Sequence, residues 1–418
     1  MPHLIFFGLR RTDFWCAWTF VACFFVLWFL SKPARTGEYQ KQGEAVGEGT
    51  YGTVWKGIRC LDNAEVAMKK VILRHQKEGF PSTAIREIRA LRALQNHPNV
   101  VKLHDVYTEM PGTNGVGDAY LIFEYVQHDL TGFMTYRKKL KLPEVKCLAR
   151  QLLDGLDYCH LHNFMHRDLK PSNILLTGKG DLKLCDFGLS RSFPDKSMGQ
   201  YSTRVITLWY RPPELLLGTA KYNFSVDIWS AGCIIGEMMN STPLFPDASE
   251  IQVLRKIRNR CCVFNQEDWP ENIRKLPYWE KYWQQINRPP GPGEKDLFAD
   301  LTVKHGREAV ELLKDCLSLD PAKRPDTAGL LTSHWFEADP LPCLPSEMKM
   351  PPEGSGMKEL GVRKRQVQRE EAKEDEDKVA RDGKPRASHA QQAERPKRTA
   401  PDEGREGPEP SPKRPRPP

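Results

Sequence analysis

The chain has no CxxC pair, only a small excess of positive charge, and almost no aromatic residues after about Pro345. Its eleven cysteines are scattered, and the adjacent Cys261 and Cys262 have poor geometry for bonding to each other. This usage predicts reduced, mostly buried thiols in a reducing compartment. A net charge of +8 over 418 residues is too weak to indicate direct nucleic-acid binding.

The C-terminal end is rich in Lys, Arg, Glu and Pro. Such a composition buries too little apolar surface to order itself, so we predict that residues 345–418 form a disordered charged tail. Two short basic clusters, at residues 395–398 and 412–416, have two interpretations. They are nuclear-import signals that place the protein in the nucleus, or they are simply part of a solvated basic tail.

One long hydrophobic run, residues 14–30, lies within an apolar N-terminal segment that we delimit as residues 1–36. The run is at the short end of the roughly 17–25 residues needed to cross a bilayer. Positive residues on its two sides nearly balance, so no orientation is predicted. Two interpretations stay open: a membrane anchor with the folded part in the cytosol, or upstream sequence translated from a wrong start.

An ordered set of polar residues lies between His166 and Glu214. Phosphoryl transfer from ATP requires a carboxylate beside the attacking hydroxyl, oxygen ligands for Mg²⁺ and a cation near the transferred phosphate. The residues with these properties, in that order, are Asp168, then Asn173 and Asp186, then Lys170.

The order and spacing of this set resemble those of eukaryotic protein kinases over residues 39–336. The resemblance implies an α+β, bilobal kinase fold, with a small, mostly β N-lobe at residues 39–125 and a larger, mostly α C-lobe at 126–336. Lys170, two residues after Asp168 and followed by Pro171, resembles the serine/threonine class.

A G-x-G-x-x-G-x-V run at residues 47–54 is followed by an alternating strand pattern at 53–58, as in a β-hairpin. Glycines there let the backbone close over ATP phosphates. Lys69 matches the lysine that holds the α- and β-phosphates, and Glu87 is placed to pair with it. Phe123 resembles the gatekeeper, with backbone groups of Glu124 and Val126 on adenine. The full nucleotide site implied by the resemblance comprises Val46, Gly47, Glu48, Gly49, Thr50, Tyr51, Gly52, Val54, Ala67, Lys69, Phe123, Glu124, Val126 and Asp129.

Residues 81–87, P-S-T-A-I-R-E, begin a segment with helical spacing of apolar residues. The buried stripe predicted for this helix consists of Ile85, Ile88, Leu91 and Leu94. The heptapeptide resembles the signature helix of cyclin-dependent kinases. It implies that a cyclin docks on Pro81–Glu87 and swings Glu87 inward, so that the isolated chain is largely inactive.

The segment after Asp186 resembles the activation segment of this family. Ser202 aligns with the activating phosphosite, with Thr203 as a register alternative. Three arginines stand where the family binds that phosphate: Arg86, Arg167 and Arg191. Thr50 and Tyr51 match inhibitory phosphosites. Three residues resemble the pocket for a proline after the target Ser/Thr: Val205, Ile206 and Arg211.

Asp227 resembles the residue that braces the catalytic loop, and Glu214 with Arg324 resembles an ion pair that fastens the activation segment. Phrases at residues 124–132, 201–205, 211–214 and 339–343 resemble the transcriptional branch, and the plant C-type members in particular. That branch pairs with T- or K-type cyclins and phosphorylates the C-terminal repeats of RNA polymerase II.

Four alternatives to this interpretation follow from the same sequence. Two are a cell-cycle cyclin-dependent kinase and a membrane-tethered signalling kinase. A mitogen-activated kinase is disfavoured because no Thr-x-Tyr pair precedes Val205. A cyclin-binding scaffold without activity is disfavoured because the catalytic residues are intact.

Overall fold

The structure, a computed structural model, describes residues 37–49, 52–72, 80–109, 118–193, 201–202, 205–288, 296–352 and Lys358. The N-terminal apolar segment and both basic clusters lie outside these ranges. Within the described ranges, no helix is long and apolar enough to cross a membrane.

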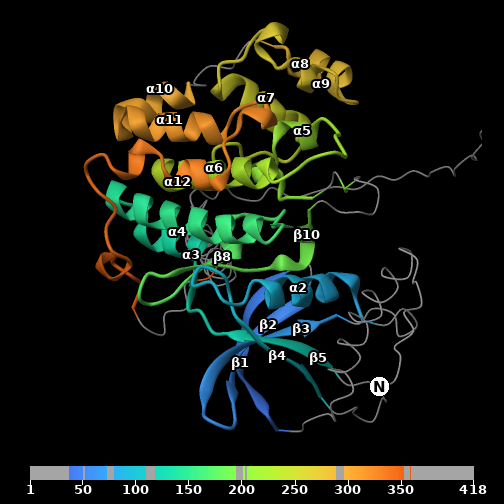
Figure 1. Cartoon of the computed structure of the whole chain (residues 1–418), viewed down its shortest axis with the longest axis vertical. Helices are drawn as coiled ribbons and strands as arrows, with labels where there is room; N and C mark the ends of the chain where they lie inside the picture. The colour runs from blue at the N-terminus through green and yellow to red at the C-terminus, as the bar shows by residue number, and fades with distance from the viewer. Residues whose placement is uncertain are drawn as a thin grey trace, which may run out of the picture. The chain divides into compact units, whose positions relative to one another are not determined.

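A five-stranded antiparallel sheet forms the N-lobe, below the helical lobe in Figure 1. Side chains alternate between its faces. Val66 and Met68 therefore pack on the outer face with Tyr107, Tyr120 and Ile122, while Ala67 and Lys69 share the opposite face. The strands, in spatial order, are β1 (Tyr39–Gly49), β2 (Gly52–Arg59), β3 (Ala64–Val71), β5 (Ala119–Glu124) and β4 (Leu103–Thr108).

The helix α2 (Ser82–Ala93) lies beside this sheet (Figure 1). The predicted apolar stripe is confirmed, with Ile88, Leu91 and Leu94 buried and Ile85 half-buried. Glu87 is also buried on this helix, 3% exposed. A buried carboxylate requires a charged or hydrogen-bonding partner, so its place on the inner face indicates a site there.

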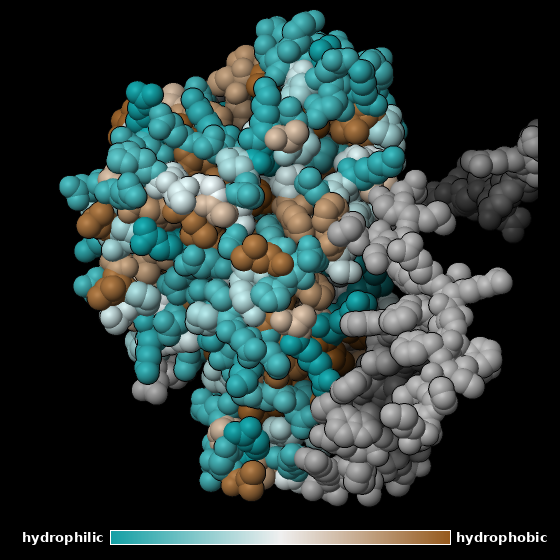
Figure 2. Space-filling model, viewed as in Figure 1, coloured by the Kyte–Doolittle hydropathy of each residue, from teal (hydrophilic) through white to brown (hydrophobic). Residues whose placement is uncertain are grey.

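The C-lobe is built around α4 (Leu142–Leu161) and α6 (Ser225–Asn240), which pack against each other. All residues of α6 except Asn240 are buried, so this helix is the centre of the lobe. Figure 2 shows a largely hydrophilic surface on the viewed face, with hydrophobic residues in scattered groups. The other helices are α3 (Leu130–Arg137), α5 (Pro213–Leu216), α7 (Glu250–Arg260), α8 (Glu271–Arg274), α9 (Trp279–Ile286), α10 (Leu297–His305), α11 (Arg307–Cys316) and α12 (Thr327–Leu331).

Two small sheets lie at the junction of the lobes and carry the loops between their strands. β6 (His128–Asp129), β8 (Ile174–Leu176) and β9 (Leu182–Leu184) form one, and β7 (Phe164–Met165) with β10 (Arg191–Ser192) forms the other. The loops and turns between these short strands carry four residues predicted to perform the chemistry: Asp168, Lys170, Asn173 and Asp186.

The predicted start of the disordered tail, at residue 345, is too early. Residues 338–352 continue as an ordered segment, here called the strap, that runs back along α4 (orange in Figure 1). The Cys343 N–H donates to the Pro143 carbonyl at 3.2 Å, and Arg137 Nη1 donates to the Lys349 carbonyl at 3.2 Å. Met348 is buried. Composition averaged over a long charged tail does not reveal a short apolar stretch that packs against the folded domain.

The nine cysteines in the described ranges are all free thiols. Cys147, Cys159, Cys233 and Cys316 are buried, and burial raises the pKa of Cys316, for example, to about 12. Thiols of this kind stay protonated and unreactive at neutral pH. Three more are half-buried, and Cys60 and Cys262 are exposed. The prediction of mostly buried cysteines is therefore wrong for the described part of the chain, where fewer than half of the thiols are buried.

The ion pair of Arg324 with Glu214 yields a prediction about stability. Two guanidinium–carboxylate bonds of 2.7 and 2.8 Å join side chains that are 0% and 4% exposed. Arg324→Ala leaves the Glu214 carboxylate buried without its partner, so we expect the free energy of unfolding to fall by about 3–5 kcal/mol. A urea titration of both proteins measures it.

The matched control is Lys275→Ala, which removes an exposed pair with Glu271 whose side chains are each 71% exposed. That change is expected to leave the free energy of unfolding nearly unchanged, because an exposed ion pair is screened by water and salt. Equal losses in the two variants would contradict the structural importance of the Arg324–Glu214 pair.

Candidate active site

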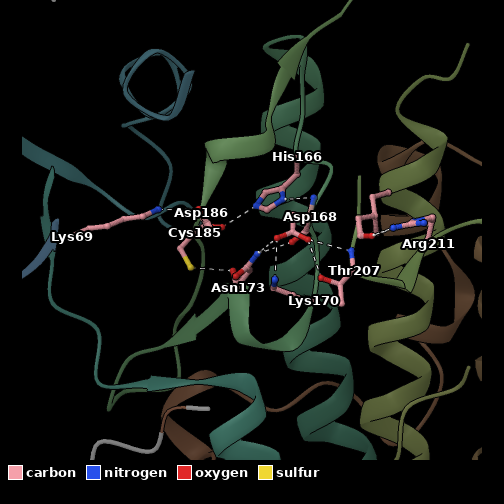
Figure 3. Close-up of polar contacts among 10 residues, drawn as sticks. Lys69, His166, Asp168, Lys170, Asn173, Cys185, Asp186, Thr207 and Arg211 are labelled. Atoms are coloured by element: carbon pink, nitrogen blue, oxygen red, sulfur yellow. Dashed lines mark hydrogen bonds and ion pairs between the residues drawn. The ribbon is translucent and has the colours of Figure 1, made fainter. Parts of the chain in front are cut away.

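The Asp168 carboxylate is the point on which the polar side chains of the C-lobe converge (Figure 3). Its Oδ2 accepts from Asn173 Nδ2 at 3.0 Å and lies 3.1 Å from Lys170 Nζ. Its Oδ1 accepts from Thr207 Oγ1 at 3.1 Å. The structure thus brings together the three catalytic-loop residues that the motif predicted, and adds a hydroxyl from the activation segment.

Asp227 on α6 holds the loop that carries Asp168. The two Asp227 carboxylate oxygens accept the backbone N–H groups of His166 and Arg167, each at 2.8 Å, and His160 Nε2 lies 3.1 Å away. Burial alone would raise the pKa of Asp227, but these partners hold it below its ordinary value. The predicted bracing by Asp227 is confirmed.

Backbone strain is concentrated at this loop and at the motif that follows it. Arg167 has φ of 66° and Asp186 has φ of 62°, in the left-handed region that residues other than glycine seldom occupy. Such conformations persist where surrounding contacts enforce them, and they are typical of active sites. The Asp227 hydrogen bond to the Arg167 N–H is one of the enforcing contacts.

Lys69 of β3 joins the two lobes electrostatically. Its Nζ lies 2.8 and 2.9 Å from the Glu87 oxygens and 2.9 Å from Asp186 Oδ1. Burial opposes the charged form of Lys69, but the Asp186 and Glu87 carboxylates outweigh it and raise the Lys69 pKa. Burial and the Asp186 charge raise the pKa of Glu87. The pairing predicted between Lys69 and Glu87 is present in the structure.

Asp186 and Asn173 are kept near each other by backbone contacts. The Cys185 N–H donates to the Asn173 carbonyl at 3.0 Å, and the His166 ring packs on Phe187 at 4.7 Å between centroids. A carboxylate and an amide oxygen are hard ligands, which Mg²⁺ prefers when it keeps several waters and binds phosphate oxygens as well. The donor set fits that ion.

The sheet places the predicted nucleotide-site residues on neighbouring strands. In cross-strand register Gly47 faces Val54, Val54 faces Lys69, and Ala67 faces Phe123. Gly52 closes the hairpin with φ of 146°, and a side chain there would meet the Lys70 carbonyl, so glycine is required. Thr50 and Tyr51 lie outside the described residues. For Glu48 and Gly49 the structure describes the backbone alone.

Two hinge residues already have partners. The Glu124 N–H donates to the Lys102 carbonyl at 3.1 Å. Of the two backbone groups of Glu124, the carbonyl is therefore the one that could contact adenine. Asp129 Oδ1 accepts from the Gly132 N–H at 2.7 Å and caps α3. The motif did not predict that capping role, although an Asp before a helix is its usual signal.

Sequence reasoning missed Lys358. Its Nζ lies 5.1 Å from the centre of the Tyr125 ring, beside the hinge, and its charge acts on His128 and Cys185. No motif marks this lysine, because it lies far along the chain from the hinge residue that it contacts.

The predicted phosphosite, Ser202, is exposed. Arg167 is buried, 3% exposed, and burial together with the nearby Arg191 charge lowers its pKa. Within the described ranges no carboxylate forms an ion pair with Arg167. Arg86 lies on α2, where Nη2 contacts Ser82 Oγ at 3.4 Å. Thr203 lies outside the described residues.

The predicted proline pocket has an unusual backbone. Ile206 has φ of 65°, a costly conformation for a β-branched residue. Arg211 stabilises it, because Nε donates to the Val205 carbonyl at 2.9 Å and Nη2 to the Ile206 carbonyl at 3.0 Å. Arg211 Nη1 also pairs with Glu250 at 2.7 Å.

Comparison with known proteins identifies the family and the fold. The model of the family described as "Protein kinase domain" matches residues 40–336. A chain from the structure of the CAK complex from Chaetomium thermophilum bound to ATP-gamma-S is 32% identical, with a TM-score of 0.62, over 74% of this chain and 94% of that chain. The predicted kinase fold, with a sheet N-lobe and a helical C-lobe, is confirmed.

Curated relatives narrow the family. Cyclin-dependent kinase C-1 of Oryza sativa subsp. japonica is 40% identical over 346 residues, 79% of this chain and 64% of that protein. Cyclin-dependent kinase 12 of Drosophila melanogaster is 41% identical, over 79% of this chain and 28% of that protein. The chain thus spans less than two thirds of these two relatives.

Cyclin-dependent kinase 20 of Danio rerio is 40% identical over 74% of this chain and 86% of its own length. The resemblance to plant C-type members, predicted from the sequence, is confirmed by the rice relative. The chain belongs to the protein kinase family and, within it, to the cyclin-dependent kinases.

Proposed function

We propose that the chain is a cyclin-activated, proline-directed serine/threonine kinase that transfers the γ-phosphate of ATP to Ser/Thr-Pro sites. The observation that carries the proposal is the convergence of Lys170, Asn173 and Thr207 on the Asp168 carboxylate. We assign the N-lobe to residues 39–125, the C-lobe to 126–336, and the cleft between them to ATP.

In the proposed reaction Asp168 orients the substrate hydroxyl and accepts its proton as the bond to phosphorus forms. Lys170, 3.1 Å from Asp168, supplies positive charge beside the transferred phosphate. Asn173 and Asp186 would hold Mg²⁺, which would neutralise charge on the phosphate oxygens. Lys69 binds the α- and β-phosphates, and Glu87 keeps its ammonium group in place.

Phosphorylation of Ser202 is proposed to activate the enzyme. Arg167 is a buried cation, and the neighbouring Arg191 makes its charge less favourable. A phosphate dianion would relieve that repulsion and accept charge-assisted hydrogen bonds from both guanidinium groups. Arg86 is assigned to the same phosphate from α2.

Proline selectivity follows from the carbonyl groups that Arg211 holds. The Val205 and Ile206 carbonyls are occupied by its guanidinium, so the backbone N–H of a residue after the target would find no acceptor there. Proline has no N–H to leave unsatisfied. The pocket formed by Val205, Ile206 and Arg211 therefore favours proline.

The remaining assignments follow from the family. We propose that a cyclin of the T or K type docks on the Pro81–Glu87 helix, and that the substrate is the C-terminal repeat of RNA polymerase II, in the nucleus. The C-type relative supports the cyclin-dependent class, while the cyclin type, the substrate and the compartment rest on the resemblance to the transcriptional branch. The basic clusters of the tail would serve as the nuclear address.

Replacing the proposed base tests the chemistry. In the complex purified with its own cyclin, Asp168→Asn is expected to lower kcat by about 10²–10⁴-fold, because the amide cannot accept the hydroxyl proton. Its KM for ATP stays close to that of the wild type, since Lys69 and the hinge are untouched. Glu311→Gln, an exposed change on α11, is the control. Full activity in Asp168→Asn would refute the assignment.

Peptide selectivity tests the substrate class. A polymerase-repeat peptide with Ser-Pro is expected to have a kcat/KM about 5- to 150-fold above its Ser-Ala counterpart, the range that one unsatisfied buried N–H implies. Arg211→Gln should narrow this ratio. A Lys-rich Ser/Thr-Pro peptide is offered alongside. Preference for it over the repeat would favour the cell-cycle branch and contradict the proposed polymerase substrate.

A further inference from the structure

The side chain of Tyr222, in the loop before α6, joins two functional segments. Its hydroxyl donates to the Ser202 carbonyl at 2.9 Å and accepts from Arg167 Nη1 at 2.9 Å. Burial raises the pKa of Tyr222 to about 12, although the Arg167 charge opposes this. The hydroxyl therefore stays protonated at neutral pH and can make both hydrogen bonds at once.

Arg167 is itself tied to the catalytic machinery. Its backbone N–H donates to Asp227, and the next residue is Asp168. Its Nε donates to the Leu189 carbonyl, directly after the Asp-Phe-Gly motif, at 2.9 Å. Tyr222 thus connects the backbone at Ser202 to the residue that precedes the proposed base.

A second set of contacts supports the same junction. The Tyr201 N–H donates to the Ala220 carbonyl at 2.9 Å, and the rings of Tyr201 and Tyr222 lie 5.0 Å apart. The Arg167 guanidinium is 5.7 Å from the Tyr201 ring and 5.9 Å from the Tyr222 ring. Residues 201–202 are therefore paired with residues 220–222 by groups of the chain itself.

We propose that Tyr222 is a positioning residue that holds the activation segment at Ser202 against the catalytic loop. It supplies part of the order that a phosphate on Ser202 would otherwise supply alone. The inference rests on the proposed function, because it concerns the same phosphosite. Its consequence is a basal activity that survives without phosphorylation and depends on one hydroxyl group.

The test uses four versions of the cyclin complex: wild type, Ser202→Ala, Tyr222→Phe and the double variant. Phenylalanine keeps the ring contacts and removes the hydroxyl. We expect Tyr222→Phe to lower kcat/KM for peptide only about two- to threefold in phosphorylated enzyme. In the Ser202→Ala background we expect kcat/KM to fall about tenfold or more, because no phosphate is present to replace the lost charge-assisted hydrogen bond to Arg167.

If Tyr222 only supported the fold, Tyr222→Phe would lower kcat/KM equally in both backgrounds, and that result would overturn the inference. No fall in kcat/KM in either background would overturn it as well. Amide hydrogen exchange at Tyr201 gives a readout independent of activity, and should be faster in Tyr222→Phe than in the wild type. Unchanged exchange would contradict the proposal. Tyr278→Phe, at a half-exposed position near α9, is the control. If the wild-type complex transfers no phosphate at all, the proposed function fails, and this inference with it.

Discussion

The Asp227 carboxylate is the interaction on which the site depends. It is fully buried on the central helix of the C-lobe, and its two oxygens accept the N–H groups of His166 and Arg167. A buried charge is tolerated only with such partners. By holding these two amides, Asp227 enforces the left-handed conformation of Arg167 and fixes the backbone next to Asp168.

The second half of the site depends on ion pairs between side chains of the two lobes. Lys69 from the sheet, Glu87 from α2 and Asp186 from the C-lobe form one cluster, in which Glu87 is buried and the other two are partly exposed. Each ionised partner stabilises the opposite charge. These ion pairs join the N-lobe to the C-lobe. Asp186, which has a positive φ, belongs to this cluster, and its ion pair with Lys69 is one of the contacts that hold it in place.

The sequence was most informative where function depends on short spacing. Asp168, Lys170 and Asn173 lie within one loop, so their order alone predicted their convergence, and the 3.6-residue period predicted the buried stripe of α2. Contacts between distant segments could not be predicted in this way. The docking of Met348 and the approach of Lys358 to Tyr125 depend on tertiary packing. Local composition carries no signal for them.

The most direct test of this account is the ATP affinity and turnover of Asp227→Asn in the cyclin complex. The amide has one oxygen, so it cannot accept both backbone N–H groups, and its NH₂ group would face one of them. The account predicts a fall in kcat of about 10²-fold or more from misplacement of Asp168, with the Kd for ATP unchanged within about threefold. Wild-type turnover in Asp227→Asn would contradict it.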